Sequence, residues 1–166
     1  MVLRLLRWSD RWLVNALKFL TGFAFGCVVF SVTAGIVYRY ILKSPIGWVE
    51  EFSRLSFIWS VFMGACVATR QKEHLKIRIF SGKLGPTGAA VHDLVTSLLT
   101  LAFFAVVLVH GPTIYDAMAS QYYAGMPLSQ KWQVLPIIIG AAIMSLYLVE
   151  SVVTTAANLF KAGIQK

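Results

Sequence analysis

The stretch that decides the fold runs from Gly47 to Leu75 and reads GWVEEFSRLSFIWSVFMGACVATRQKEHL. It opens with the carboxylates of Glu50 and Glu51 and the guanidinium of Arg54, and then stays uncharged until Arg70. Charged side chains at the mouth of a membrane-length apolar segment are costly unless they have partners. We therefore expect a transmembrane helix whose charged entrance has a function.

The composition extends this interpretation to the whole chain. Of 166 residues, 58% are hydrophobic and 13% are charged, whereas about a quarter of the residues in soluble domains are charged. Four segments are long and apolar enough to cross a bilayer, at about 13–38, 46–69, 92–115 and 134–160. The sequence therefore predicts an all-α membrane protein, with a single four-helix transmembrane domain over residues 1–166.

The basic residues predict how the chain is oriented. Eleven of the fifteen lie at the two termini and in the middle loop, and positive residues stay in the cytoplasm. We therefore expect both termini to be cytoplasmic. The chain has a net charge of +8, but its basic residues do not gather on one face as they do in nucleic-acid-binding proteins. Membrane orientation explains their positions better. The four on the opposite side are Arg39, Lys43, Arg54 and Lys131.

A short interfacial helix is predicted before the first span. Leu5, Trp8 and Trp12 recur at helical spacing beside a stripe of arginines, which suits a helix lying among lipid phosphates. A frayed basic tail is the alternative. The basic middle loop is also expected to lie on the cytoplasmic membrane face. The predicted lipid-headgroup residues are Arg4, Arg7, Arg11, Lys76 and Arg78.

The charges at the entrance of the second span allow two interpretations. Glu50 and Arg54 are four positions apart, so they share a helix face and can pair. Glu51 points about 100° away from that face. The group either forms a stabilising ion pair at the helix end or contacts another protein chain. The predicted helix-entrance or subunit-contact residues are Trp48, Glu50, Glu51, Arg54 and Trp59.

Glu150 is the deepest acidic residue in the predicted spans, about 15 Å along a helix from Lys161. An ionisable group at that depth requires a partner. We expect an ion pair with Lys18, which lies on the same side of the membrane, or a protonated carboxyl group. A proton relay would need further intramembrane acids or histidines at stepped depths, and the sequence does not supply them.

Small residues mark positions where helices can approach closely. Gly22 and Gly26 form a G-x-x-x-G motif in the first span, and Ser31 and Gly35 repeat the spacing. The predicted helix-packing residues are Gly22, Gly26, Gly64 and Gly140.

The sequence contains no motif that indicates an enzyme active site or a metal site. Cys27 and Cys66 lie inside apolar runs without C-x-x-C spacing. His92 and His110 are about 27 Å apart along one helix, so they cannot ligate one haem iron, and His74 lies in the basic loop. No zinc-ligand spacing, nucleophile turn or phosphate-binding loop is present. We expect no enzymatic activity, no metal and no cofactor.

A family resemblance rests on the second span. Its pattern W-x-E-E-x-x-R, followed by W, G-A, R and H, resembles the small membrane subunit, of the DctQ type, of tripartite ATP-independent periplasmic (TRAP) transporters. The resemblance covers about residues 13–160, although Lys76 and Arg78 stand where many members carry an acidic residue. The matching residues are Trp48, Glu50, Glu51, Arg54, Trp59, Gly64, Ala65, Arg70 and His74, with Arg39-Tyr40 before them and Pro136 and Gly140 after them.

The resemblance implies an auxiliary subunit of the bacterial inner membrane. Its partners would be a large membrane subunit, which binds sodium and carries the substrate, a periplasmic substrate-binding protein, and phospholipids. The substrate would be an organic acid of the C4-dicarboxylate or sialic acid type. Two alternatives remain open: a small proton-coupled transporter, for which Glu150 is the main feature, and a quinone- or haem-linked redox membrane protein.

Overall fold

The computed structural model describes residues 2–44, 46–72 and 86–164. In this part of the chain four α-helices are present: α1 (Val2–Ile36), α2 (Gly47–Lys72), α3 (Pro86–Ala119) and α4 (Lys131–Ile164). All four are long and apolar enough to cross a membrane, over Trp12–Ile41, Gly47–Gln71, Leu94–Ala119 and Lys131–Thr155. The predicted all-α fold with four transmembrane helices is confirmed.

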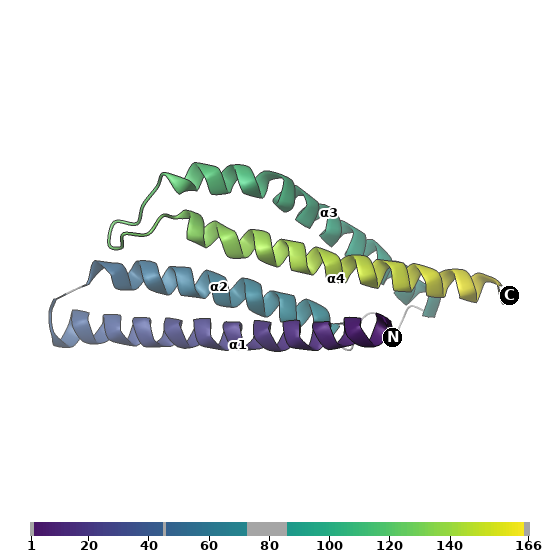
Figure 1. The fold of residues 1–166 in the computed structure, drawn as a ribbon, viewed down its shortest axis with the longest axis horizontal. Coiled ribbons are helices and arrows are strands. Elements are labelled where there is room, and N and C mark those ends of the chain that lie inside the picture. The colour runs from purple at the N-terminus through teal and green to yellow at the C-terminus, as the bar shows by residue number, and fades with distance from the viewer. Residues whose placement is uncertain (1, 45, 73–85, 165–166) are drawn as a thin grey trace.

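The helices follow one another across the molecule in the order α1, α2, α4, α3 (Figure 1). Helix α1 packs on α2, α2 on α4, and α4 on α3. The protein thus consists of two helical hairpins that meet through α2 and α4. Both termini lie at one end of the molecule, and the start of α2 and the α3–α4 loop lie at the other (Figure 1).

Helix α1 begins at Val2 and is continuous to Ile36, so the predicted short interfacial helix is not a separate element. Its residues form the first turns of α1. The physical reason is that neither glycine nor proline occurs between Val2 and Thr21, so nothing in this stretch ends a helix.

The other end of α1 widens into a π-helical turn, η1 (Val37–Ile41). The Leu42 N–H donates to the Val37 carbonyl at 3.1 Å, and the Ser44 N–H donates to the Tyr38 carbonyl at 3.1 Å. Lys43 has a positive φ of 50°, a left-handed conformation that ends a helix. These bonds turn the chain sharply toward α2.

The core lies where α1, α2 and α4 meet. Leu17, Met63, Cys66 and Met144 form a buried cluster from these three helices. At Gly140, an added Cβ atom would approach the Phe62 side chain to 3.2 Å, so this glycine lets α4 come close to α2. Tight packing between apolar helices depends on such small residues.

Two of the predicted packing glycines have no close neighbour within the chain. A Cβ atom on Gly22 or Gly26 would meet nothing within 4 Å, whereas one on Gly64 would approach Thr21 to 3.3 Å and one on Gly35 would approach Val49 to 2.9 Å. The α1–α2 contact therefore uses Gly35 and Gly64, and the G-x-x-x-G motif lies on the open surface of α1.

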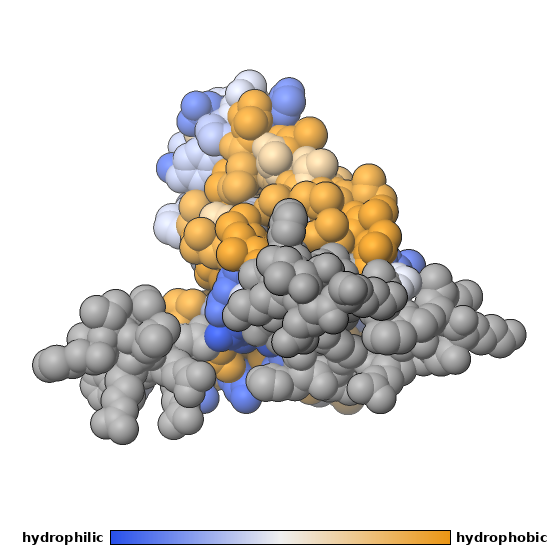
Figure 2. Space-filling model, turned by 90° about the vertical axis from the view of Figure 1, so that its right-hand side faces the viewer, coloured by the Kyte–Doolittle hydropathy of each residue, from blue (hydrophilic) through white to orange (hydrophobic). Residues whose placement is uncertain are grey.

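Large apolar side chains cover much of the outer surface. On α3, Leu99, Phe103 and Val109 are each more than 60% exposed. Seen along the helices from the end with the termini, hydrophobic residues form a broad patch over α3 and α4 (Figure 2). Apolar surface of this extent suits contact with lipid or with another membrane protein.

Candidate functional site

Glu50, Glu51 and Arg54 lie at the end of the molecule where η1, the start of α2 and the α3–α4 loop meet. Two contacts and one group without an ion pair define this end: an ion pair between Glu50 and Arg39, a carboxylate clamp from Glu51 to the loop, and the exposed guanidinium of Arg54.

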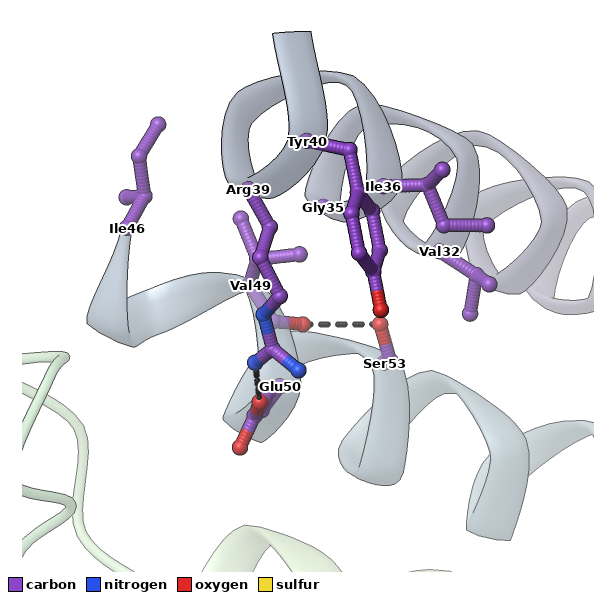
Figure 3. Close-up of a pocket in the computed structure, with 9 residues that line it drawn as sticks. All are labelled: Val32, Gly35, Ile36, Arg39, Tyr40, Ile46, Val49, Glu50 and Ser53. Carbon is purple, nitrogen blue, oxygen red and sulfur yellow. Dashed lines mark hydrogen bonds and ion pairs between the residues drawn. The ribbon is translucent and has the colours of Figure 1, made fainter. Parts of the chain in front are cut away.

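Glu50 pairs with Arg39 of η1 and not with Arg54, as the four-residue spacing had suggested (Figure 3). The end of α1 with η1 lies beside the first turn of α2, so an arginine eleven positions earlier lies opposite the carboxylate. Both side chains are more than half exposed, at 56% and 68%. An ion pair this open adds only about 0–1 kcal/mol to stability, which leaves both groups available to a ligand or partner.

Glu51 clamps the α3–α4 loop to the start of α2. The backbone N–H groups of Ala124 and Gly125 donate to its two carboxylate oxygens, each at 2.9 Å. A Cβ atom at Gly125 would lie 2.6 Å from the Gly47 carbonyl carbon and 2.7 Å from the Trp48 nitrogen. Only glycine permits this approach, so the clamp and the glycine together fix the loop on α2.

The clamped loop is ordered by its own hydrogen bonds. Tyr122 and Ser129 form an antiparallel bridge, and the Tyr123 N–H donates to the Leu128 carbonyl at 3.0 Å. The Ser129 hydroxyl lies 3.1 and 2.9 Å from the carbonyls at the end of α3, and it accepts the Lys131 N–H at the start of α4. Ser129 thus caps both helices, and the loop presents one defined surface.

Aromatic residues from α2 and the α3–α4 loop pack at this end of the molecule. The Trp59 indole N–H donates to the Trp132 carbonyl at 3.2 Å and so ties α2 to the start of α4. Trp48 is 40% exposed and packs edge-on against Phe52. Tyr123 is buried and donates to the Gln133 side chain at 3.3 Å.

Tyr123 is also the group whose titration the site perturbs. Burial raises the pKa of its hydroxyl above the ordinary value. The positive charge of Arg54 opposes this rise in pKa, and the negative charge of Glu51 adds to it. The neutral phenol is therefore the form that the folded loop favours.

Arg54 differs from its two acidic neighbours. Its side chain is exposed, and within the described residues no hydrogen bond or ion pair satisfies it. Phe57 and Val61, which follow it at helical spacing, are 53% and 45% exposed. One face of α2 thus combines a free guanidinium with apolar side chains at membrane depth, where an unpaired charge calls for a partner.

A second polar contact lies near the opposite end of α2. The Arg70 guanidinium donates to Glu150 at 3.2 Å and lies 5.2 Å from the centre of the Tyr147 ring. Glu150 therefore pairs with Arg70 and not with Lys18, whose side chain is exposed on α1. Arg70 lies in the last turn of α2, at the same depth in the predicted spans as Glu150. This shared depth could have predicted the ion pair from the sequence.

The predicted lipid-headgroup residues lie mostly beyond the described side chains. Lys76 and Arg78 fall outside the described residues, and Arg4, Arg7 and Arg11 belong to the first turns of α1. Within the described residues, no three His, Cys, Asp or Glu side chains come together as a metal site would require.

Comparisons with known proteins agree on one family. The family described as "Tripartite ATP-independent periplasmic transporters, DctQ component" matches residues 28–158. A TRAP transporter small permease protein of Haemophilus influenzae is 26% identical over 135 residues, covering 81% of this chain and 83% of the relative. The sialic acid TRAP transporter small permease protein SiaQ of Vibrio cholerae is 24% identical over 106 residues, covering 64% of this chain and 61% of the relative.

Proposed function

This chain belongs to the DctQ family of small TRAP transporter subunits, and we propose that it braces the large membrane subunit while that subunit moves an organic acid across the membrane. It is a multi-pass protein of the bacterial inner membrane and not an enzyme. In our proposal the large subunit binds the sodium ions and the substrate. A periplasmic binding protein delivers that substrate, and both termini of this chain face the cytoplasm.

The observation that carries the proposal is the exposed Arg54 face of α2. A guanidinium within a membrane-spanning segment is costly without an ion-pair partner, and in the described residues no carboxylate forms an ion pair with Arg54. Phe57 and Val61 extend the same face with apolar surface. We assign this face to the large subunit, with an acidic side chain of that subunit opposite Arg54.

The internal contacts support a bracing role. Helix α2 is tied to the α3–α4 loop by Glu51 and to the body of α4 by Arg70 and Glu150. Ties at both ends of a helix resist sliding and splaying of the two hairpins. A scaffold that holds its shape is what a moving transport domain requires.

The substrate is proposed at the level of a class. One relative is named as a sialic acid transporter subunit, which supports an organic acid, of the sialic acid or C4-dicarboxylate type, as the transported molecule. Selectivity between these acids would reside in the large subunit and the binding protein.

The test is to co-express this chain with the large subunit and the binding protein and to measure sodium-dependent organic-acid uptake in proteoliposomes. We expect uptake to need this chain, and we expect Arg54→Ala to lower both co-purification and uptake. Lys43→Ala is the matched control, because it removes an exposed positive charge from the same end of the molecule. Uptake by this chain alone would refute the auxiliary role, and unchanged co-purification and uptake for Arg54→Ala would refute the assigned face.

A further inference from the structure

A cavity of about 380 Å³ opens between the end of α1 with η1 and the first turns of α2. Its volume lies within the usual range of small-molecule sites, roughly 300–1,000 Å³. Figure 3 shows Arg39 and Glu50 on one side of the cavity and Val32 and Ile36 on the other. The bracing role does not use this cavity.

The cavity is amphipathic along the membrane normal. Arg39, Tyr40 and Glu50 lie at the ends of two candidate spans, where the bilayer interface begins. Val32 lies seven residues before Arg39, roughly 10 Å deeper along the helix. The opening is therefore polar at headgroup depth, and the wall is apolar at acyl-chain depth.

The base of the cavity is closed by internal contacts. The Ser53 hydroxyl lies 2.7 Å from the Val49 carbonyl and 2.8 Å from the Ser31 hydroxyl, so it is already satisfied. Gly35 and Val49 are in close contact at the same level. The polar groups left for a ligand are thus those of the opening.

The opening carries one charge of each sign. The Arg39 guanidinium has five N–H donors and spends few of them on Glu50, while one Glu50 oxygen remains outside that pair. In the described residues the Tyr40 hydroxyl has no hydrogen-bond partner, and its side chain is 72% exposed. A ligand that fits bears a phosphate for Arg39 and a hydrogen-bonding ammonium for Glu50.

We propose that this cavity binds one phosphatidylethanolamine molecule from the adjoining membrane leaflet. Its phosphate contacts Arg39, its primary ammonium contacts Glu50, and one acyl chain lies against Val32 and Ile36. Phosphatidylglycerol lacks the ammonium and meets the negative charge of Glu50. Phosphatidylcholine has a quaternary ammonium, which cannot donate a hydrogen bond to the carboxylate.

Native mass spectrometry of the full chain in mild detergent, with equimolar phosphatidylethanolamine, phosphatidylglycerol and phosphatidylcholine, tests the proposal. We expect wild-type protein to retain phosphatidylethanolamine at least about tenfold better than the other two lipids. Arg39→Gln should lower this retention about tenfold. Glu50→Gln should make the retention of phosphatidylethanolamine and of phosphatidylglycerol nearly equal. Lys43→Gln, outside the cavity at the same end, should behave as wild type. Equal retention of all three lipids, or an equal loss with Lys43→Gln, would overturn the proposal.

Two further arms keep the test decisive. Val32→Trp fills the apolar wall and leaves the ion pair in place, so it should abolish retention without changing thermal stability; continued binding would overturn the site. The complex with the large subunit should still hold the lipid. Loss of the lipid from that complex would overturn the proposal, because a side chain of the large subunit would then occupy the cavity. Arg54→Ala should retain the lipid, which separates this proposal from the bracing role.

Discussion

The Glu51 clamp allows the sharpest prediction about stability. Replacing Glu51 with Gln keeps the size of the side chain but leaves one carbonyl oxygen to accept, and it turns an amide N–H group toward a backbone donor. One of the two 2.9 Å bonds is lost and the other loses its charge. A hydrogen bond to a charged group contributes about 1.5–3 kcal/mol. Glu51 is only half-buried, so we count the two bonds together as one such contribution. We therefore expect the free energy of opening the loop to fall by about 1.5–3 kcal/mol in total.

Hydrogen exchange of the Ala124 and Gly125 amides measures that opening directly. A loss of 1.5–3 kcal/mol corresponds to exchange about 13- to 160-fold faster. Glu50→Gln is the matched control, since it removes the adjacent carboxylate and breaks only an exposed ion pair. Exchange in Glu51→Gln as slow as in Glu50→Gln would refute the argument that the carboxylate fixes the loop.

Three further results follow from the same structure. Gly125→Ala should lower the thermal stability clearly, because its Cβ would lie 2.6 Å from backbone, whereas Gly22→Ala should leave the stability unchanged; equal midpoints would contradict this. Glu150→Gln should destabilise the purified chain by about 1 kcal/mol through loss of its arginine partner on α2, and Lys18→Gln should not, as thermal unfolding of the two variants would show. The raised pKa of Tyr123 means that its contribution to stability is present below about pH 10 and is lost as the pH rises through the raised value. The thermal midpoint should therefore fall further across this alkaline range in the wild type than in a Tyr→Phe variant at that position, and an equal fall would contradict the argument.

The spans could be predicted from the sequence because bilayer thickness sets the length of an apolar helix. The partners of the charged residues could not. Glu50 has one arginine four positions later and another eleven positions earlier, and the choice depends on the π-helical turn that reorients the end of α1. No residue spacing in the sequence predicts that π-helical turn.

The neighbours of Glu150 and of the glycines could not be predicted from the sequence either. Depth alone predicted that Glu150 needs a cation, but Lys18 and Arg70 satisfy that condition equally until the packing of α2 on α4 is known. The G-x-x-x-G motif predicted close packing at Gly22, but the rotation of α1 turns that motif outward. Which helices are neighbours, and how each is rotated, depends on side chains from several helices at once.

The clamp between Glu51 and the α3–α4 loop also bears on the order in which the protein is made. The carboxylate and the amides that it holds are 73 and 74 residues apart in the chain. When a ribosome has released the first hairpin, α2 has entered the membrane, but the loop that covers its entrance has not yet been synthesised. The first hairpin is therefore inserted with its acidic entrance uncovered, and the second hairpin completes the protein by docking onto it within the bilayer.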